Sequence, residues 1–311
     1  MKVLASRRFP GPAFAELTDV EFLGAPLPDG IGARRADVEA LAVVTEVVDD
    51  RALHLLPALR LVANYGAGYD GIDVAACAAR GVAVTNTPGV VDGATADLAF
   101  ALMLATRRRV VEGDSLLRRG VWPSGDERFF GQDIAQATIA IVGLGQIGRA
   151  VARRARVFDM HVRYNQRRRL PEADERALGV DWGELDELLG IADVVSLHVP
   201  LADTTRHLID ARRLALMKPG AALINTSRGA VVDEEALIVA LTSGRISAGL
   251  DVFAEEPRVP AGLLALPNVV LTPHIGTATL RTRAAMTRLL VDNILAAAAR
   301  RPLPNLVTPA P

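Results

Sequence analysis

The chain alternates short apolar, β-branched runs with longer helical patterns, and this alternation constrains its fold more than any other feature. Such a rhythm predicts parallel sheets with helices on both faces. Runs without polar residues, such as Ile139-Ala140-Ile141-Val142, are typical of strands buried on both sides. The length of 311 residues is about twice the ~150 of an average domain. We therefore predict an α/β protein with two doubly wound parallel-sheet domains and strands at 3–5, 41–45, 61–64, 82–85, 138–142, 161–164, 194–198, 222–225, 249–252 and 269–272.

Two long helical patterns stand apart from the shorter ones. An Ala- and Leu-rich pattern over 93–119 predicts one helix that ends before Pro123, because proline stops a helix. An amphipathic pattern over 279–300 predicts a second helix of about five or six turns.

Charge and composition exclude several classes of protein. Lys and Arg number 35 against 36 Asp and Glu, so no global field favours nucleic acid or anionic lipid. The single cysteine, Cys77, excludes an internal disulfide and any multi-cysteine metal site, and no metal is expected. The purest apolar stretch, 98–106, is shorter than the ~18 to 20 residues of a membrane span, and residues 1–10 lack a secretory signal. We expect a cytoplasmic protein.

A glycine-rich turn connects a predicted strand to a predicted helix over 149–158. It reads Gly143-Leu144-Gly145-Gln146-Ile147-Gly148. Glycine suits a tight turn, a backbone approach to pyrophosphate and close packing of helix on strand, while the helix start offers free N–H groups. The turn could be structural, but its place before a second strand at 161–164 favours a dinucleotide site.

The end of that second strand indicates which cofactor binds. An acidic residue about 20 positions after the glycines would bond the ribose 2′-hydroxyl of NAD. This chain has Gln166 there, followed by Arg167, Arg168 and Arg169. An amide and guanidinium groups suit a 2′-phosphate, which a carboxylate would repel. We predict that NADP(H) is preferred and that NAD(H) is possible; the alternative is that the arginines form a solvated face.

Three ionisable side chains each follow a predicted strand: Arg228 after 222–225, Glu256 after 249–252 and His274 after 269–272. Open α/β sheets bind ligands at the carboxyl ends of their strands. An arginine fork fits a substrate carboxylate, and a histidine oriented by a carboxylate can transfer a proton. Each residue alone could be an ordinary surface ion pair, but together they form a candidate catalytic set.

Several motifs in fixed order resemble the D-isomer-specific 2-hydroxyacid dehydrogenases. The likeness covers about residues 40 to 300 and includes 65–70, 84–89, 143–148, 198–201, 205–207, 225–229, 231–233, 249–253, 256–257 and 272–276. It implies that Arg228 grips the substrate carboxylate, that His274 is the general acid and that Glu256 keeps His274 protonated. The backbone of Ala67 and Gly68 would bind the substrate too. The implied cofactor-binding residues are Thr95, Gly143, Gly145, Gln146, Ile147, Gly148, Gln166, Arg167, Arg168, Val199, Pro200, Thr205, Thr226, Ser227, Asp251, His274 and Gly276.

The resemblance also implies a domain division. A flavodoxin-like substrate-binding domain would comprise residues 1–92 and 277–311. A Rossmann dinucleotide-binding domain, residues 93–276, would be inserted into it, and cleft closure would exclude water from the reaction. Family members are usually dimers through the dinucleotide domain, so we expect a homodimer.

Within the family, the absence of an acidic residue at Gln166, followed by Arg167, resembles the pattern of the NADPH-dependent glyoxylate and hydroxypyruvate reductases. A small 2-oxo acid or 2-hydroxy acid is the expected substrate. The acidic stretch 45–50 argues against a phosphorylated acid. Two alternatives are an NAD-dependent D-2-hydroxyacid dehydrogenase of another substrate and a non-enzymatic, NAD(P)-sensing protein that resembles the family's transcriptional co-repressors.

Overall fold

The computed structural model describes residues 1–308, except for the side chain of Arg128. The last part of the predicted first domain, residues 309–311, lies outside the described residues. Contacts divide the chain into two compact units. One comprises Met1–Val91 and the chain from Thr277 on, and the other comprises Asp92–Gly276. In the described part of the chain, no helix has both the length and the apolar character needed to cross a membrane.

The first unit contains a five-stranded parallel sheet in the order β2-β1-β3-β4-β5. This is the doubly wound order of flavodoxin-like folds. Its central strands are buried along their whole length, as expected for a sheet covered on both faces. The strands are β1 (Val3–Ala5), β2 (Val20–Phe22), β3 (Ala40–Val43), β4 (Leu61–Asn64) and β5 (Ala83–Thr85).

Side-chain caps fix where the helices of this unit begin. Asp49, Asp73 and Thr279 each accept a hydrogen bond from a backbone N–H in the following turn, which satisfies a group that the helix start leaves unpaired. The last helix packs against β4 and a short 3-10 turn, so the carboxyl end of the chain completes the first unit. The helices are α1 (Asp50–Leu55), α2 (Val74–Ala79) and α11 (Leu280–Ala298), with 3-10 turns η1 (Pro12–Glu16) and η2 (Asp29–Ile31).

The second unit contains a seven-stranded parallel sheet in the order β12-β11-β10-β9-β6-β7-β8. Chain order reverses between β6 and β9, which is the switch point where Rossmann folds bind dinucleotides. The predicted pair of parallel-sheet α/β domains is confirmed. The strands are β6 (Thr138–Val142), β7 (His161–Asn165), β8 (Asp181–Trp182), β9 (Val194–Leu197), β10 (Ala222–Asn225), β11 (Ser247–Leu250) and β12 (Val269–Leu271).

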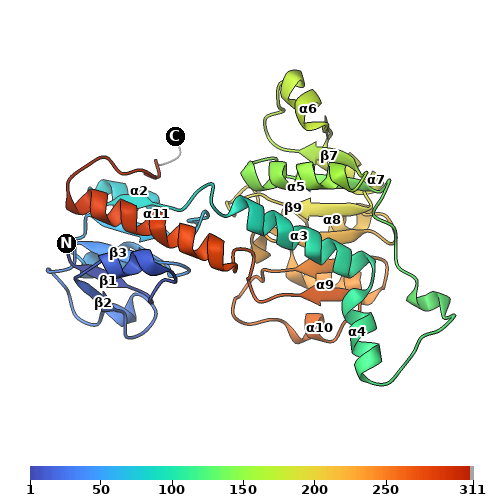
Figure 1. The fold of residues 1–311 in the computed structure, drawn as a ribbon, viewed down its shortest axis with the longest axis horizontal. Helices are drawn as coiled ribbons and strands as arrows, with labels where there is room; N and C mark the ends of the chain where they lie inside the picture. Colours follow the sequence, from blue (N-terminus) through green and yellow to red (C-terminus); the bar gives the residue numbers. More distant parts are fainter. Residues whose placement is uncertain (309–311) are drawn as a thin grey trace. The chain divides into compact units, whose positions relative to one another are not determined.

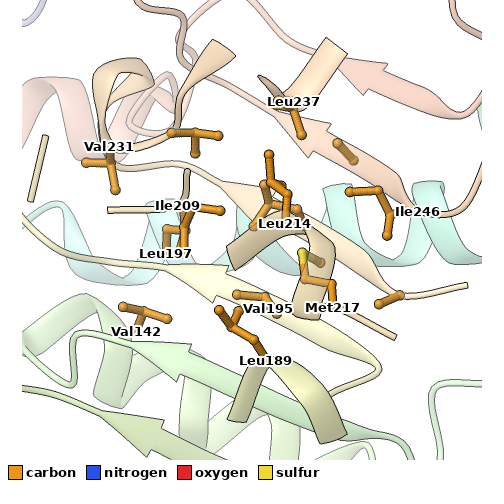
Figure 2. Packing of buried hydrophobic residues seen from close by; sticks show 14 of the residues in the cluster. Val142, Leu189, Val195, Leu197, Ile209, Leu214, Met217, Val231, Leu237 and Ile246 are labelled. Carbon is orange, nitrogen blue, oxygen red and sulfur yellow. The ribbon is translucent and has the colours of Figure 1, made fainter. Parts of the chain in front are cut away.

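Two apolar cores lie on the two faces of this sheet. Alternate residues of β6 divide between them: Ile139 and Ile141 join one core, whereas Ala140 and Val142 join the other. The second core is filled by leucine, valine and isoleucine side chains from several helices and strands (Figure 2). The helices are α3 (Asp92–Arg107), α4 (Val110–Arg118), α5 (Gln146–Val157), α6 (Glu172–Leu178), α7 (Leu185–Ile191), α8 (Ala211–Leu216), α9 (Glu234–Thr242) and α10 (Ala261–Leu264), with 3-10 turns η3 (Glu127–Phe129) and η4 (Gly229–Val231) (Figure 1).

The single helix predicted over 93–119 is wrong, because the structure has two helices, α3 and α4. Arg109 between them adopts a left-handed conformation with φ of 51°. The buried Arg107 guanidinium donates to the carbonyl oxygens of Asp133 and Asp193, which fixes the end of α3 beneath the sheet. The sequence does not indicate this break, because residues 107–110 between the two helices include no proline or glycine.

Candidate active site

Six loops of the second unit carry most of the predicted site residues, and all six follow the carboxyl ends of parallel strands. The carboxyl ends of such strands share one edge of the sheet, where open α/β folds bind ligands. By strand, the residues are Gly143, Gly145, Gln146, Ile147 and Gly148 after β6; Gln166, Arg167 and Arg168 after β7; Val199, Pro200 and Thr205 after β9; Thr226, Ser227 and Arg228 after β10; Asp251 and Glu256 after β11; and His274 and Gly276 after β12.

The three glycines of the turn after β6 have different physical causes. Gly143 has φ of 94°, and a Cβ there would lie 2.6 Å from the carbonyl oxygen of His198. A Cβ at Gly148 would collide with the carbonyl oxygen of Gly143. Gly145 has an ordinary φ of −72°, and no described atom lies within 4 Å of the place its Cβ would take. The protein's own packing therefore explains two glycines, while the third fits a ligand that approaches the backbone.

The helix α5 begins at Gln146, earlier than the predicted start at residue 149. Its first turn includes Gln146, Ile147 and Gly148, and no side chain caps it at Gly145. The unpaired N–H groups and the dipole at such a helix start favour an anion such as a pyrophosphate. With the open space at Gly145, the turn fits a dinucleotide cofactor.

The segment after β7 divides the run of three arginines. The amide of Gln166 is used within the protein: its Oε1 accepts from Leu144 N at 3.3 Å, and its Nε2 donates to Arg168 O at 2.7 Å. Arg167 and Arg168 are exposed, and the structure describes no bond from either guanidinium to residues 1–308. Arg169 instead forms two hydrogen bonds to Glu175, at 2.9 and 2.8 Å. Two arginines of the run, rather than three, have side chains available for a ligand.

Other predicted cofactor residues differ in how much the protein already uses them. Thr226 Oγ1 is buried and has no hydrogen-bond partner among the described residues, which suits a donor or acceptor supplied by a ligand. Ser227 Oγ donates to Asn225 Oδ1 at 2.8 Å. Thr205 Oγ1 donates to Pro200 O at 2.6 Å, so it shapes the turn after β9. For Val199, the structure describes no polar contact with residues 1–308.

Asp251 organises the segment that carries the histidine. Its carboxylate accepts from Thr272 Oγ1 at 2.6 Å and from the N–H groups of Ile275 and Gly276, both at 2.8 Å. Burial raises the pKa of Asp251, although these hydrogen bonds act in the opposite direction. Thr95, in the first turn of α3, lies beside Asp251, since both approach a Cβ built at Gly276. The role of Asp251 in cofactor binding stays a prediction.

The predicted acid and its orienting carboxylate are in contact. His274 Nδ1 lies 2.6 Å from Glu256 Oε2, and Phe253 N donates to Glu256 Oε1 at 3.0 Å. His274 has φ of 52°, a left-handed backbone that its N–H bond to Asp251 O helps to hold. Burial alone would raise the pKa of Glu256, but hydrogen bonds from His274 and Phe253 and the nearby charges of His274 and Arg228 lower it overall.

Arg228 reaches the same edge of the sheet through a tightly packed turn. Asn225 is fully buried and donates to Arg228 O at 2.9 Å, and Arg228 Nη1 donates to Ser227 O at 2.8 Å. A Cβ at Gly229 would collide with the backbone at Phe253. The turn after β10 therefore lies against the loop after β11, and the charge of Arg228 acts on Glu256.

Ala67 and Gly68 lie in the first unit, in the loop after β4. Asn64 Nδ2 donates to the carbonyls of Gly66 and Gly68, and Asn86 Nδ2 donates to that of Ala67 at 2.8 Å. The carbonyl groups thus bond within the protein, and the structure describes no acceptor in residues 1–308 for the N–H groups of Ala67 and Gly68. Those N–H groups are available to an anion.

Two side chains outside the predicted site residues hold the others in place. Asn225 caps the turn that carries Arg228, and Thr272 bonds the carboxylate of Asp251. Both are polar residues at the end of an otherwise apolar strand, which is the signal that could have identified them.

The chain is similar to several known proteins. Residues 100–276 match the family described as D-isomer specific 2-hydroxyacid dehydrogenase, NAD binding domain. A glyoxylate reductase of Thermococcus litoralis is 49% identical over 278 residues, which cover 87% of this chain and 84% of that protein. A solved structure from Thermus thermophilus has a TM-score of 0.91 at 43% identity and covers 99% of this chain and 100% of its own.

A third relative is an NADPH-dependent glyoxylate/hydroxypyruvate reductase from Sinorhizobium meliloti, solved with NADP and malonate. Its TM-score is 0.86 at 33% identity, and the match covers 99% of this chain and 96% of that one. The fold, the glycine turn and these matches together show that the chain belongs to the D-isomer-specific 2-hydroxyacid dehydrogenase family of NAD(P)-binding oxidoreductases.

Proposed function

We propose that this enzyme reduces small 2-oxo acids, with glyoxylate and hydroxypyruvate as the best candidates, and that it prefers NADPH. The contact between His274 and Glu256 is the observation that carries the proposal, because it supplies a proton donor at a sheet edge that also holds a cationic Arg228. The names of the Thermococcus and Sinorhizobium relatives support the choice of substrate.

The proton comes from His274. Because the pKa of Glu256 is lowered, its carboxylate is ionised near neutral pH and can only accept at Nδ1. The bonded Nδ1 therefore carries a hydrogen, and the other ring nitrogen, Nε2, is the one that can donate to the oxygen of the 2-oxo group. The ionised Glu256 stabilises the positive charge that His274 carries before the transfer. When bound, the reduced nicotinamide supplies the hydride to the carbonyl carbon.

Arg228 binds and orients the anionic substrate in this proposal. A guanidinium fork suits a carboxylate, and a positive charge near the 2-oxo oxygen stabilises the negative charge that grows there. The substrate contact of Ala67 and Gly68, which lie in the first unit, stays a prediction. Thr226, Ser227, Asp251, Gly276 and Thr95 would hold the nicotinamide half of the cofactor, and the turn from Gly143 to Gly148 would hold its pyrophosphate.

The preference for NADPH rests on the segment after β7. No acidic side chain follows this strand before Glu172, and Arg167 and Arg168 have no partner among residues 1–308. Two guanidinium groups can pair with a 2′-phosphate, whereas NAD(H) offers them only a hydroxyl. NAD(H) would still bind through the rest of the site.

Steady-state kinetics with both cofactors test the proposal. Glyoxylate, hydroxypyruvate and pyruvate are assayed with NADPH and with NADH by the loss of absorbance of the reduced nicotinamide. We expect turnover of the first two substrates and a kcat/KM that is higher with NADPH. The paired substitution Arg167→Ala and Arg168→Ala should remove most of that preference and leave kcat with NADH unchanged. A higher kcat/KM with NADH in the unmodified enzyme would refute the phosphate site, and cofactor binding without turnover of any 2-oxo acid would favour a sensing protein.

A further inference from the structure

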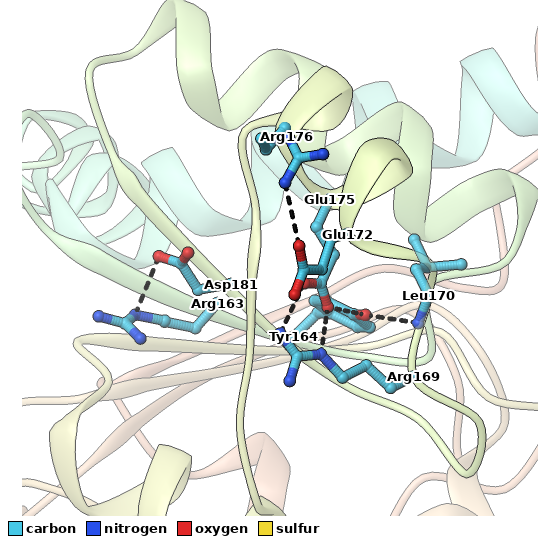
Figure 3. A network of polar contacts seen from close by, with 8 residues as sticks. All are labelled: Arg163, Tyr164, Arg169, Leu170, Glu172, Glu175, Arg176 and Asp181. Atoms are coloured by element: carbon cyan, nitrogen blue, oxygen red, sulfur yellow. Dashed lines mark hydrogen bonds and ion pairs between the residues drawn. The ribbon is translucent and has the colours of Figure 1, made fainter.

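A buried carboxylate outside the site described above, Glu175 on α6, connects to the segment that carries Arg167 and Arg168 (Figure 3). We propose that Glu175 is a positioning residue for cofactor selection: it holds Arg169 and Tyr164 so that the neighbouring Arg167 and Arg168 present their guanidinium groups to a 2′-phosphate. This inference rests on the proposed preference for NADPH.

Glu175 is an unusual position for an acidic residue because its side chain is only 8% exposed. Its Oε1 accepts from Tyr164 OH at 2.6 Å and from Arg169 Nε at 2.9 Å, while its Oε2 accepts from Arg169 Nη2 at 2.8 Å. The two bonds from Arg169 form a bidentate pair, the arrangement that fixes geometry best between these groups. The hydrogen bonds from Arg169, and after them the bond from Tyr164, lower the pKa of Glu175 to about 2, because together they outweigh the effect of burial. The carboxylate therefore stays ionised near neutral pH.

Tyr164 extends the network to the backbone. It is fully buried on β7, and its hydroxyl oxygen accepts from Leu170 N at 2.8 Å while the O–H donates to Glu175. Burial, followed by the hydrogen bond to Glu175, raises the pKa of Tyr164 to about 12. The guanidinium of Arg169 also lies over the ring of Trp182 on β8, 5.9 Å from its centre.

The segment from Gln166 to Leu170 is therefore fixed at both ends. At its start, the amide of Gln166 bonds to Leu144 of the glycine turn and to Arg168 O. At its end, Arg169 and Leu170 are held by Glu175 and Tyr164. Arg167 and Arg168 lie between these anchors, and the structure describes no partner for their side chains in residues 1–308. Preorganisation of this kind lowers the entropic cost of binding an anion.

Glu175→Gln tests the role with almost no change of size. The amide can accept one bond from Arg169 but cannot form the charged bidentate pair. Equilibrium binding to the unmodified chain and the variant is measured by calorimetry with NADPH, with NADH, with 2′-AMP and with 5′-AMP. We expect the Kd for NADPH and for 2′-AMP to rise roughly tenfold, about one charge-assisted contact, while the Kd for NADH and for 5′-AMP stays within about twofold.

Glu172→Gln is the matched control. Glu172 lies on the same helix one turn earlier and pairs with Arg176 at 3.1 Å, and both side chains are exposed. Glu172 acts on Arg169 through its charge alone, with no hydrogen bond or ion pair described between them. This variant should bind all four ligands as the unmodified chain does. Tyr164→Phe provides a second route, because it removes the bonds to Glu175 and Leu170 and leaves the carboxylate and Arg169 intact. This variant should also raise the Kd for NADPH more than the Kd for NADH.

The outcomes separate this inference from the proposed function. If the unmodified chain prefers NADPH and the substitution of Arg167 and Arg168 removes that preference, but Glu175→Gln and Tyr164→Phe keep it, only the positioning role is refuted. Equal loss of NADPH and NADH binding in the folded variants would show a general structural effect and would refute it too. If the unmodified chain binds both cofactors equally, the phosphate site and the positioning role both fail.

Discussion

Single residues of the site differ in whether the protein or a ligand explains them. Gly143 and Gly148 are required by neighbouring backbone, whereas the place that a Cβ of Gly145 would take is open. Similarly, hydrogen bonds within the protein already occupy the polar groups of Ser227, Thr205 and Gln166. Thr226 Oγ1, in contrast, has no partner among the described residues. Side chains that the fold does not use are the best guides to ligand contacts.

His274 is the residue whose removal should affect the reaction most. The substitution His274→Ala removes the proposed proton donor and leaves the glycine turn from Gly143 to Gly148 unchanged. We expect kcat to fall by about 10²–10⁴, the usual contribution of an acid–base residue, with little change in the Kd for NADPH. Stopped-flow measurement of the first turnover, together with fluorescence titration of the cofactor, checks both parts. A kcat within a few fold of the unmodified enzyme would remove His274 from the mechanism.

Short helices and strands are harder to predict from this sequence than the motifs that follow the strands. The apolar pattern does not predict the strands β2 and β8, because Val20-Glu21-Phe22 and Asp181-Trp182 are short, partly charged edge strands rather than apolar runs. The order of the motifs along the chain nevertheless led to the glycine turn and to the strand ends. The division of the arginine run could not be predicted, because the bonds of Glu175 on α6 to Arg169 and to Tyr164 of β7 form only in the folded chain.

Two substitutions in the glycine turn before helix α5 should have different effects, one on cofactor binding and the other on stability. Gly145→Ala adds a methyl group in open space at an ordinary φ, so the chain should keep its melting temperature without cofactor. Its Kd for NADPH should rise by roughly tenfold or more, because the methyl group would lie where we propose that the pyrophosphate binds. Gly148→Ala is the contrast: its methyl group collides with Gly143 O, so the melting temperature itself should fall. Calorimetric melting with and without NADPH distinguishes the two.

At the scale of the whole molecule, the expected homodimer has a candidate surface in the second unit. Large apolar side chains are exposed on α4 and the segment that follows it: Trp122 is 77% exposed and Phe130 67%. Val110, Val111 and Leu117 of α4 are each at least half exposed. Large exposed apolar side chains are common in protein interfaces, so we expect a second copy of the chain to bind the segment 110–130.

Sedimentation velocity tests this surface. We expect the unmodified chain to sediment as a dimer, and Leu117→Asp with Trp122→Asp should shift it to a monomer, because each change would bury a charge. Val157→Asp is the control, since Val157 is 82% exposed on α5, away from α4 in the sequence and outside this surface. If the unmodified chain sediments as a monomer, or if the doubly substituted chain still sediments as a dimer, α4 is not the interface.

The interrupted first unit has a consequence for how the protein is made. Its sheet is assembled from residues before Asp92, but α11, which packs against β4, comes only after Gly276. On the ribosome, the second unit is synthesised in full before the helix that completes the first one emerges. Domains tend to fold as units during synthesis, so the nascent first sheet must wait with one apolar flank of β4 uncovered. Chaperone dependence during translation should therefore fall mainly on the amino-terminal part of this chain.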